Sequence, residues 1–252
     1  MFGVLGVIWA AVWYRWFRDA PSEKAGISPA ELREIGPPLS VQHGGLPWSR
    51  ALQQPLFWNV AAIGASYVYS LGFFQLWLQT YLARGHGYSE ASLALSSLTY
   101  AIGALSNAVG GVAGDWLVRR LGLKYGRRTL GVFGLGTAAV FMLVTTLASN
   151  GTWALVFLSI AYGGILLQQP NLCAVTLDIG RRHAGTVFGF MNTASSAASA
   201  ISSVVFGYIV SLTGSYNAPL IPMAAGLAAG ACLWLWIDPT RQLFEEENEL
   251  AA

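Results

Sequence analysis

Residues 91–148 read ASLALSSLTYAIGALSNAVGGVA, then GDWLVRRLGLKYGRR, then TLGVFGLGTAAVFMLVTTLA: an uncharged apolar run, a charged turn and a second apolar run. Each apolar run is about as long as the ~20 residues that a helix needs to cross ~30 Å of hydrocarbon. The charged turn holds Asp115 and five Lys or Arg residues. This stretch predicts two membrane-crossing helices that meet at a basic loop.

The same pattern fills the carboxyl part of the chain. Six predicted spans, none with an Asp, Glu, Lys, Arg or His residue, cover residues 57–82, 91–113, 129–148, 153–177, 184–212 and 219–237. A soluble chain that is 54% hydrophobic and 10% charged would expose a large apolar surface. The predicted fold class is therefore an all-α polytopic membrane protein, with the lipid bilayer as its surroundings.

The basic residues predict an orientation. Of the 14 Lys and Arg residues, only Arg84 lies outside the region before the first span and the gaps after the second, fourth and sixth spans. Basic loops stay in the cytoplasm, so these gaps and the carboxyl terminus are expected there, in a bacterial inner membrane. This distribution accounts for the net charge of +2, and we expect no nucleic-acid partner.

The amino-terminal residues differ from the six spans. Residues 2–17 form an apolar run of only ~24 Å as a helix, and the basic residues Arg15 and Arg18 lie at its end instead of preceding it. We expect the end of a helix whose beginning is missing, and hence a fragment. The predicted parts are this helix end (1–17), a cytoplasmic central loop (18–56), the six-helix bundle (57–238) and a cytoplasmic tail (239–252). Ser28 and Glu31 predict a capped short helix over 29–35.

The charged turn carries a spaced motif. Gly111 precedes Asp115 by four residues, and two pairs of arginines follow. A glycine lets two helices approach closely, and an aspartate at the membrane edge can pair with arginines or cap a helix, so the motif predicts a conformational latch. Its residues are Gly111, Asp115, Arg119, Arg127 and Arg128. The spacing resembles the loop signature of the second half of major facilitator superfamily transporters.

Further stretches resemble one branch of that superfamily. Arg18-Asp19-Ala20-Pro21, Phe73-Phe74-x-x-Trp77, Asp178 and Gly189-x-x-Asn192 are similar to the anion:cation symporter family. The resemblance implies that the chain runs from the end of a sixth helix to the end of a twelfth. It also implies transport of hexuronates, sugar acids or other carboxylates. Two residues depart from the family: Gln79, where it usually has Pro, and Cys173, where it often has Trp. That Trp could stack on a sugar acid, so its absence argues against a sugar-acid substrate.

Polar side chains within the spans are the candidates for substrate binding, because such groups usually face a bundle interior or an aqueous cavity. Pro170 frees the carbonyl of Leu166 and predicts a kink of the kind found in transporter sites. The alternative for each candidate is an ordinary interhelical hydrogen bond or, for the aromatic one, simple packing. The candidates are Tyr69, Gln75, Gln168, Asn171, Asn192 and Ser195.

Other small and polar residues predict helix packing. The series Gly103, Asn107, Gly111 and the series Ser195, Ser199, Ser203, Gly207 recur every four residues, as in closely packed helices.

No enzymatic, cofactor or metal motif is present in the sequence. The spans also lack an acid to couple an ion and a cation to hold an anion. The resemblance implies that both lie in a missing amino-terminal half. We therefore predict part of a secondary transporter that moves a small organic anion by alternating access with a proton or sodium ion. The alternative is a half-size membrane protein that dimerises into a transporter or pore.

Overall fold

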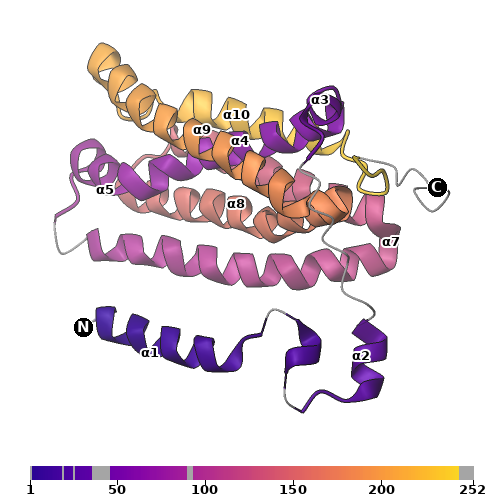
Figure 1. Cartoon of the computed structure of the whole chain (residues 1–252). Helices are drawn as coiled ribbons and strands as arrows, with labels where there is room; N and C mark the ends of the chain where they lie inside the picture. The colour runs from indigo at the N-terminus through magenta and orange to yellow at the C-terminus, as the bar shows by residue number, and fades with distance from the viewer. Residues whose placement is uncertain (1, 19, 25, 36–45, 90–92, 244–252) are drawn as a thin grey trace. The chain divides into compact units, whose positions relative to one another are not determined.

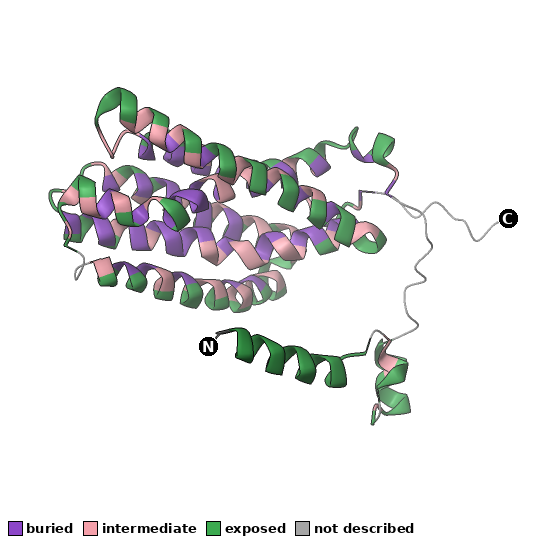
Figure 2. Cartoon of the chain, turned by 60° about the vertical axis from the view of Figure 1, so that its left-hand side comes forward, coloured by how far each residue is buried: buried purple, intermediate pink, exposed green. Residues whose placement is uncertain are grey.

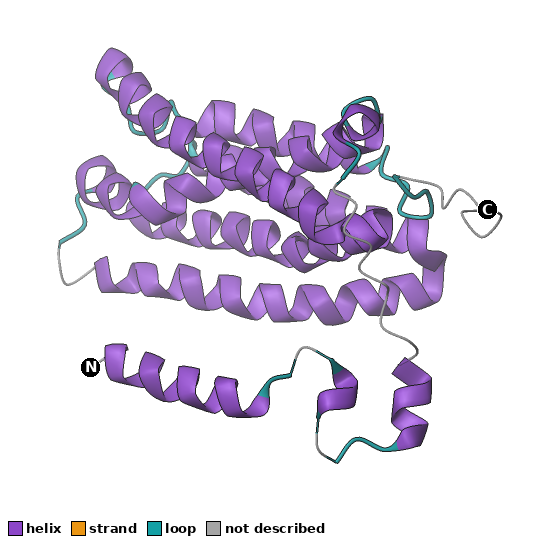
Figure 3. Cartoon of the chain, in the orientation of Figure 1, coloured by secondary structure: helices purple, strands orange, loops and turns teal. Residues whose placement is uncertain are grey.

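The computed structural model describes residues 2–18, 20–24, 26–35, 46–89 and 93–243. It separates two compact units, residues 1–44 and 45–252, which are described individually. All regular elements in the described ranges are helical (Figures 1 and 3). Parts of four predicted features lie outside those ranges: residue 1 of the helix end, residues 19, 25 and 36–45 of the central loop, 91–92 of the second span and 244–252 of the tail.

The first unit contains α1 (Phe2–Trp16), a 3-10 turn (Pro21–Glu23) and α2 (Pro29–Ile35). The backbone N–H of Glu31 donates to Ser28 Oγ at 3.1 Å, which confirms the predicted start of α2. Along α1, Trp13 stacks on Phe17 with ring centroids 4.7 Å apart. The side chains of residues 3–16 of α1 are nevertheless exposed (Figure 2), so this apolar helix buries little within its own unit.

The second unit contains the predicted spans. The short α3 (Trp48–Ala51) precedes the first predicted span, and α5 (Leu78–Thr80) lies within its last residues. A π-helical turn (Tyr81–Gly85) follows α5, and 3-10 turns cover Ala94–Ser96 and Arg181–His183. The long helices are α4 (Pro55–Leu76), α7 (Ser97–Thr145), α8 (Gly151–Gly180), α9 (Ala184–Thr213) and α10 (Leu220–Trp234). With 15 residues, α10 is shorter than the predicted span 219–237, because the chain continues as turns after Trp234.

The structure of α7 differs from the loop predicted between the second and third spans. The loop expected between the second and third spans is helical on both sides of Gly122, which alone has non-helical angles (φ 78°, ψ 166°). Glycine reaches this region without a steric penalty. The chain then doubles back on itself, as Figure 1 shows, and a Cβ added to Gly126 would lie 2.6 Å from the Val118 nitrogen. The two halves of α7 are therefore two spans joined by a one-residue reversal.

Among the described residues, three continuous helical stretches are long and apolar enough to cross a membrane: Pro55–Leu76, Ala94–Thr145 and Gly151–Thr213. The second contains the break at Gly122, and the third contains a break at Arg181, which has a φ of 42°. Large apolar side chains, among them Leu105, Val112 and Val204, remain exposed on the outside of these helices. Such a surface suits lipid better than water.

The long helices pack closely through glycines. α7 makes its most extensive contact with α8, while α4 packs on α9 and α10. A Cβ on Gly110 would collide with the Leu167 carbonyl, and one on Gly164 would lie 2.6 Å from the Gly134 oxygen. The inner faces of the helices are consequently buried, as Figure 2 shows.

Candidate functional site

One end of the second unit gathers basic side chains against the ends of α8 and α10, and we call it the basic end. Arg127, just after the Gly122 break, places Nε 3.5 Å from Asp178 Oδ2 on α8. Its Nη1 donates to Asn171 Oδ1 at 3.4 Å, and Asn171 Nδ2 donates back to the Arg127 carbonyl at 2.7 Å. These contacts tie the second half of α7 to the last turns of α8.

A second set of contacts at the basic end reaches the residues after α10. Lys124 Nζ lies 2.7 Å from Asp238 Oδ2, and Arg128 Nε donates to the Ile237 carbonyl at 2.6 Å. Burial alone would raise the pKa of Asp238, but hydrogen bonds from Lys124 and Thr240 outweigh it and lower the pKa to about 2. Asp238 therefore stays ionised and holds the chain after α10 against α7.

The five predicted latch residues divide into two groups. Arg127 and Arg128 lie in the contacts just described, and the carboxylate that Arg127 meets is Asp178. Gly111 has open space where a Cβ would be, while Asp115 and Arg119 are exposed on α7. In the part of the chain that the structure describes, no ion pair involves Asp115. These three residues thus face outward from the bundle.

Gln168 and Asn171, predicted as neighbours in one site, have different surroundings. Asn171 is buried and held by Arg127. Gln168 is also buried, and neither polar atom of its amide has a hydrogen-bond partner among the described residues. It packs against the backbone of α7, where a Cβ on Gly134 would lie 2.9 Å from Gln168 Cβ. Burying an amide without a hydrogen-bond partner costs free energy. The Gln168 amide therefore keeps donors and an acceptor that are not used within the bundle.

The other four candidates are dispersed. Ser195 is buried against Gly64, with Oγ 2.7 Å from where a Cβ would stand, whereas Gln75 and Asn192 are exposed. Tyr69 is half-buried and packs against the core. Within the described ranges, no hydrogen bond joins any of these four side chains to Gln168 or Asn171.

A polar group that the sequence analysis did not select lies beside the proline. Asn107 Nδ2, on the first half of α7, donates to Gln169 Oε1 at 3.0 Å and to the Leu166 carbonyl at 3.3 Å. Leu166 is the residue whose carbonyl Pro170 leaves without a helical donor. The first half of α7 and α8 therefore meet at this group.

Sequence patterns had placed Asn107 in a packing stripe. The signal that could have identified its role was the carbonyl of Leu166, since a buried carbonyl needs a donor. A side-chain amide on a neighbouring span has two N–H donors, so it can donate one hydrogen bond to that carbonyl and one to a second acceptor.

The end of the unit opposite the basic end has its own polar contacts. Tyr81 donates its hydroxyl to Asn217 Oδ1 at 2.8 Å, and His86 Nε2 lies 3.0 Å from the same hydroxyl. Asn217 Nδ2 in turn donates to the Thr146 carbonyl at 3.4 Å. Burial lowers the pKa of His86. This cluster joins the residues after α4, α7 and α9.

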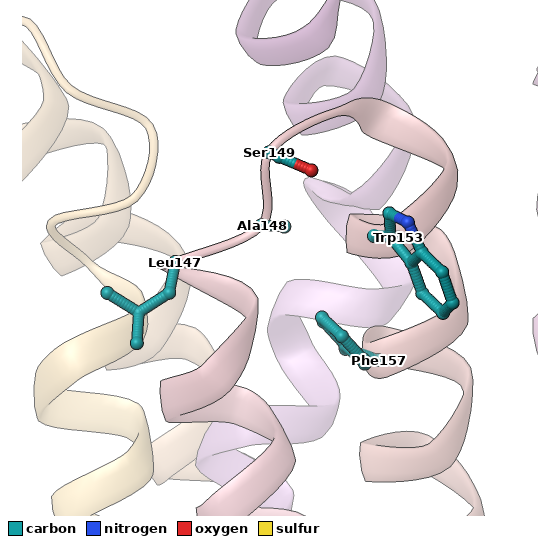
Figure 4. A pocket seen from close by; sticks show the side chains of 5 residues that line it. All are labelled: Leu147, Ala148, Ser149, Trp153 and Phe157. Atoms are coloured by element: carbon teal, nitrogen blue, oxygen red, sulfur yellow. The ribbon is translucent and has the colours of Figure 1, made fainter.

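A shallow pocket between the end of α7 and the start of α8 is lined by Leu147, Ala148, Ser149, Trp153 and Phe157 (Figure 4). The indole of Trp153 stacks on Phe157 with centroids 5.7 Å apart. Its lining offers a single polar side chain, Ser149, so it is a poor site for an anion. Among the described residues, no group of three His, Cys, Asp or Glu side chains could hold a metal ion.

Comparisons with known proteins agree with this architecture. The sequence matches the family profile of the Major Facilitator Superfamily over residues 1–203 and over residues 120–251. It is 32% identical to a probable sulfoacetate transporter of Cupriavidus necator, over 94% of this chain and 57% of that protein. It is 26% identical to the hexuronate transporter of Bacillus subtilis, over 91% and 54%, respectively.

A third relative is a probable chloroplastic anion transporter of rice, 28% identical over 92% of this chain and 40% of that protein. The chain spans about half the length of the curated relatives it matches. The structure superimposes on the crystal structure of the E. coli fucose:proton symporter with a TM-score of 0.57 and 16% identity, over 75% of this chain and 44% of that one. The chain therefore belongs to the major facilitator superfamily, as one six-helix half of its bundle, and resembles the superfamily's anion transporters.

Proposed function

We propose that the chain is the carboxyl-terminal bundle of a secondary active transporter that moves a small organic anion, a carboxylate or sugar acid or a sulfonate, by alternating access. Its relatives include transporters named for sulfoacetate and hexuronates, both of which are organic anions. Coupling to a proton or a sodium ion is part of the proposal, and the fold-related fucose transporter is a proton symporter.

The observation that carries this proposal is the half-exposed amide pair Asn107 and Gln169 in membrane-crossing helices. Polar groups at membrane depth are costly when they face lipid, so they usually face a cavity or another part of the protein. The adjacent Pro170 lies inside the continuous helix α8 and removes one of its backbone hydrogen bonds, and prolines within spanning helices are a common feature near transporter binding sites. An anion path along this face of the bundle accounts for both features.

The spans of this bundle supply only neutral hydrogen-bonding groups. The proposed transporter therefore needs a complementary amino-terminal bundle that carries a titratable acid for ion coupling and a cation for the substrate. The exposed Gln75 and Asn192 are proposed to face the shared cavity, together with Tyr69. Gln168, Asn171 and Ser195 complete the proposed binding set.

The basic end is proposed to act as the conformational latch. In this proposal, Arg127 holds α8 through Asp178 and Asn171, while the outward-facing Gly111, Asp115 and Arg119 meet the complementary bundle. Breaking and remaking these contacts would accompany alternating access. We place the basic end and the carboxyl terminus in the cytoplasm of a bacterial inner membrane.

Uptake measurements test the proposed function. Vesicles that contain the protein in its full natural length should accumulate radiolabelled sulfoacetate or glucuronate, and excess unlabelled anion should block the uptake. A neutral sugar of similar size should block it far less. Uptake of the neutral sugar with no uptake of either anion would contradict an anion transporter.

A further inference from the structure

The chain that follows α10 is fastened to α7 at its first residues, and we call residues 237–243 the strap. Arg128 Nε donates to the Ile237 carbonyl at 2.6 Å, and the Ile237 side chain is buried. Lys124 Nζ lies 2.7 Å from Asp238 Oδ2. These two α7 residues lie on either side of the arginine that pairs with α8, so the strap holds α7 where the latch arginine is placed.

The last residues of the strap are fastened to the end of α8. The backbone N–H of Leu243 donates to the Ile179 carbonyl at 3.1 Å, and the Leu243 side chain is buried. Gln242 Oε1 accepts from Arg181 Nε at 2.9 Å and from Arg181 Nη2 at 3.0 Å, since a guanidinium only donates hydrogen bonds. Ile179 directly follows Asp178, so the strap also holds the neighbours of the latch carboxylate.

The backbone of Arg181 needs such support. Its φ of 42° and ψ of −112° lie outside the regions that a residue with a side chain normally adopts. A strained backbone persists only where the surrounding contacts hold it in place. The contacts of Arg181 with Gln242 and of Ile179 with Leu243 are of this kind. The strap therefore helps to fix the point where α8 ends and α9 begins.

The pair of Arg127 and Asp178 has little geometry of its own. Nε and Oδ2 are 3.5 Å apart, and neither of these two buried atoms has a hydrogen-bond partner among the described residues. The donation from the same arginine to Asn171 is also long, at 3.4 Å. An ion contact without a short hydrogen bond is weakly directional. The position of the pair therefore depends on the elements that carry its two residues.

We propose that the strap keeps Asp178 beside Arg127 by joining α7 to the end of α8, and that it stays closed while this ion pair opens and closes during transport. The inference rests on the proposed function and deepens it, since it makes Asp238 and Gln242 positioning residues of the same latch. A pair that a separate tether keeps within reach re-forms readily, because the effective concentration of its partners stays high. Loss of the strap should slow the conformational step without weakening substrate binding.

Substitutions of Gln242 in the full-length protein test the strap. Gln242→Ala removes the acceptor for Arg181 and should lower the maximal rate of glucuronate uptake about threefold to tenfold, the range for one lost hydrogen bond, with KM unchanged. Gln242→Glu keeps an acceptor and should keep about the parent rate. The matched control is Gln53→Ala, the same change at an exposed residue before α4, which should also keep it. Asp238→Asn, which weakens the tie to α7, should reproduce the effect of Gln242→Ala. Rates are compared per folded transporter molecule.

A cross-link tests whether the strap stays closed. In a full-length protein whose own cysteines are replaced, Arg181→Cys and Gln242→Cys are joined by a flexible bifunctional thiol reagent before reconstitution. The double-cysteine protein should transport as slowly as Gln242→Ala before joining. It should regain most of the parent rate after joining, because the reagent replaces the lost contact. The reagent should leave the rates of the two single-cysteine proteins unchanged.

The outcomes separate the inference from the proposed function. Loss of transport on joining the two cysteines, or no recovery, would overturn the strap while leaving anion transport intact. A Gln242→Ala effect confined to KM, or an equal effect of Gln53→Ala, would also overturn it. Absence of glucuronate and sulfoacetate uptake by the unsubstituted protein would overturn the proposed function, and the inference with it.

Discussion

Arg127 and Asp178 form an ion pair, with Nε and Oδ2 3.5 Å apart, that joins the residues just after the Gly122 reversal to the last turn of α8. The arginine side chain is largely buried and the carboxylate is partly so. The same arginine contacts Asn171, the residue that follows Pro170 in α8. A movement of Arg127 at the basic end can therefore shift both Asp178 and Asn171 on α8.

Asp178→Asn should lower the free energy of unfolding by about 1–3 kcal/mol, because it removes one partner of a partly buried pair. Asp115→Asn should change it by no more than about 0.5 kcal/mol, because Asp115 is exposed. Thermal unfolding of both variants in one detergent measures the difference. In the full-length protein, Asp115→Asn should nevertheless slow transport far more than it alters KM. A raised KM with an unchanged maximal rate would assign Asp115 to substrate binding.

Gly110 and Gly111 are adjacent and should respond in opposite ways to alanine. Gly110→Ala pushes a methyl group into the Leu167 carbonyl and should cost about 1–3 kcal/mol of stability. Gly111→Ala meets open space and should leave stability unchanged or raise it by up to about 1 kcal/mol through helix propensity. If Gly111 packs on the complementary bundle, Gly111→Ala should still reduce transport by the full-length protein. Equal destabilisation by both changes would contradict the packing of α7 on α8.

The Lys124–Asp238 pair should make stability depend on pH in the acid range. The folded pKa of Asp238, about 2, lies below the ~3.9 of an unfolded aspartate. Its stabilisation is therefore fully present above about pH 4 and is lost as the pH falls toward 2. The difference in melting temperature between the parent chain and Asp238→Asn should be constant from pH 5 to 7 and shrink below pH 4. A difference that grows on acidification would have the wrong sign for this pair.

Much of the fold follows from hydropathy and charge. Uncharged runs predicted the positions of the long helices, because a membrane-crossing helix must be apolar for most of its length. Hydropathy placed a loop at residues 114–128, where the structure has a reversal at Gly122 alone. Charged residues do not stop a helix, and a single glycine with positive φ is enough to turn the chain.

The contacts of the candidate site were less predictable than the fold. Sequence indicated that Arg127, Asp178 and Asn171 matter, but the partner of Arg127 depends on how α7 doubles back over α8. Asn107 was assigned to packing because its i+4 spacing matches glycines. Its pairing with Leu166 and Gln169 depends on the register of α7 against α8. The spacing of residues within one helix does not determine that register.

The proposed orientation makes a direct labelling prediction. In a background with Cys173 and Cys232 replaced, a single cysteine at Asn150 or Ser215 should react with an impermeant thiol reagent added outside the cell. A cysteine at Arg120 or Arg182 should react only after the membrane is permeabilised. The reverse pattern would place the basic end outside and overturn the orientation.

The most direct test of the account is ion-driven accumulation by the 252-residue chain alone. Since the six predicted spans carry no Asp, Glu, Lys, Arg or His side chain to couple an anion to an ion gradient, vesicles containing only this chain should not concentrate sulfoacetate or glucuronate under an imposed proton or sodium gradient. Vesicles with the full-length protein should concentrate the anion and lose it when an ionophore dissipates the gradient. Ionophore-sensitive accumulation by the chain alone would contradict the account and identify a dimeric half-size transporter.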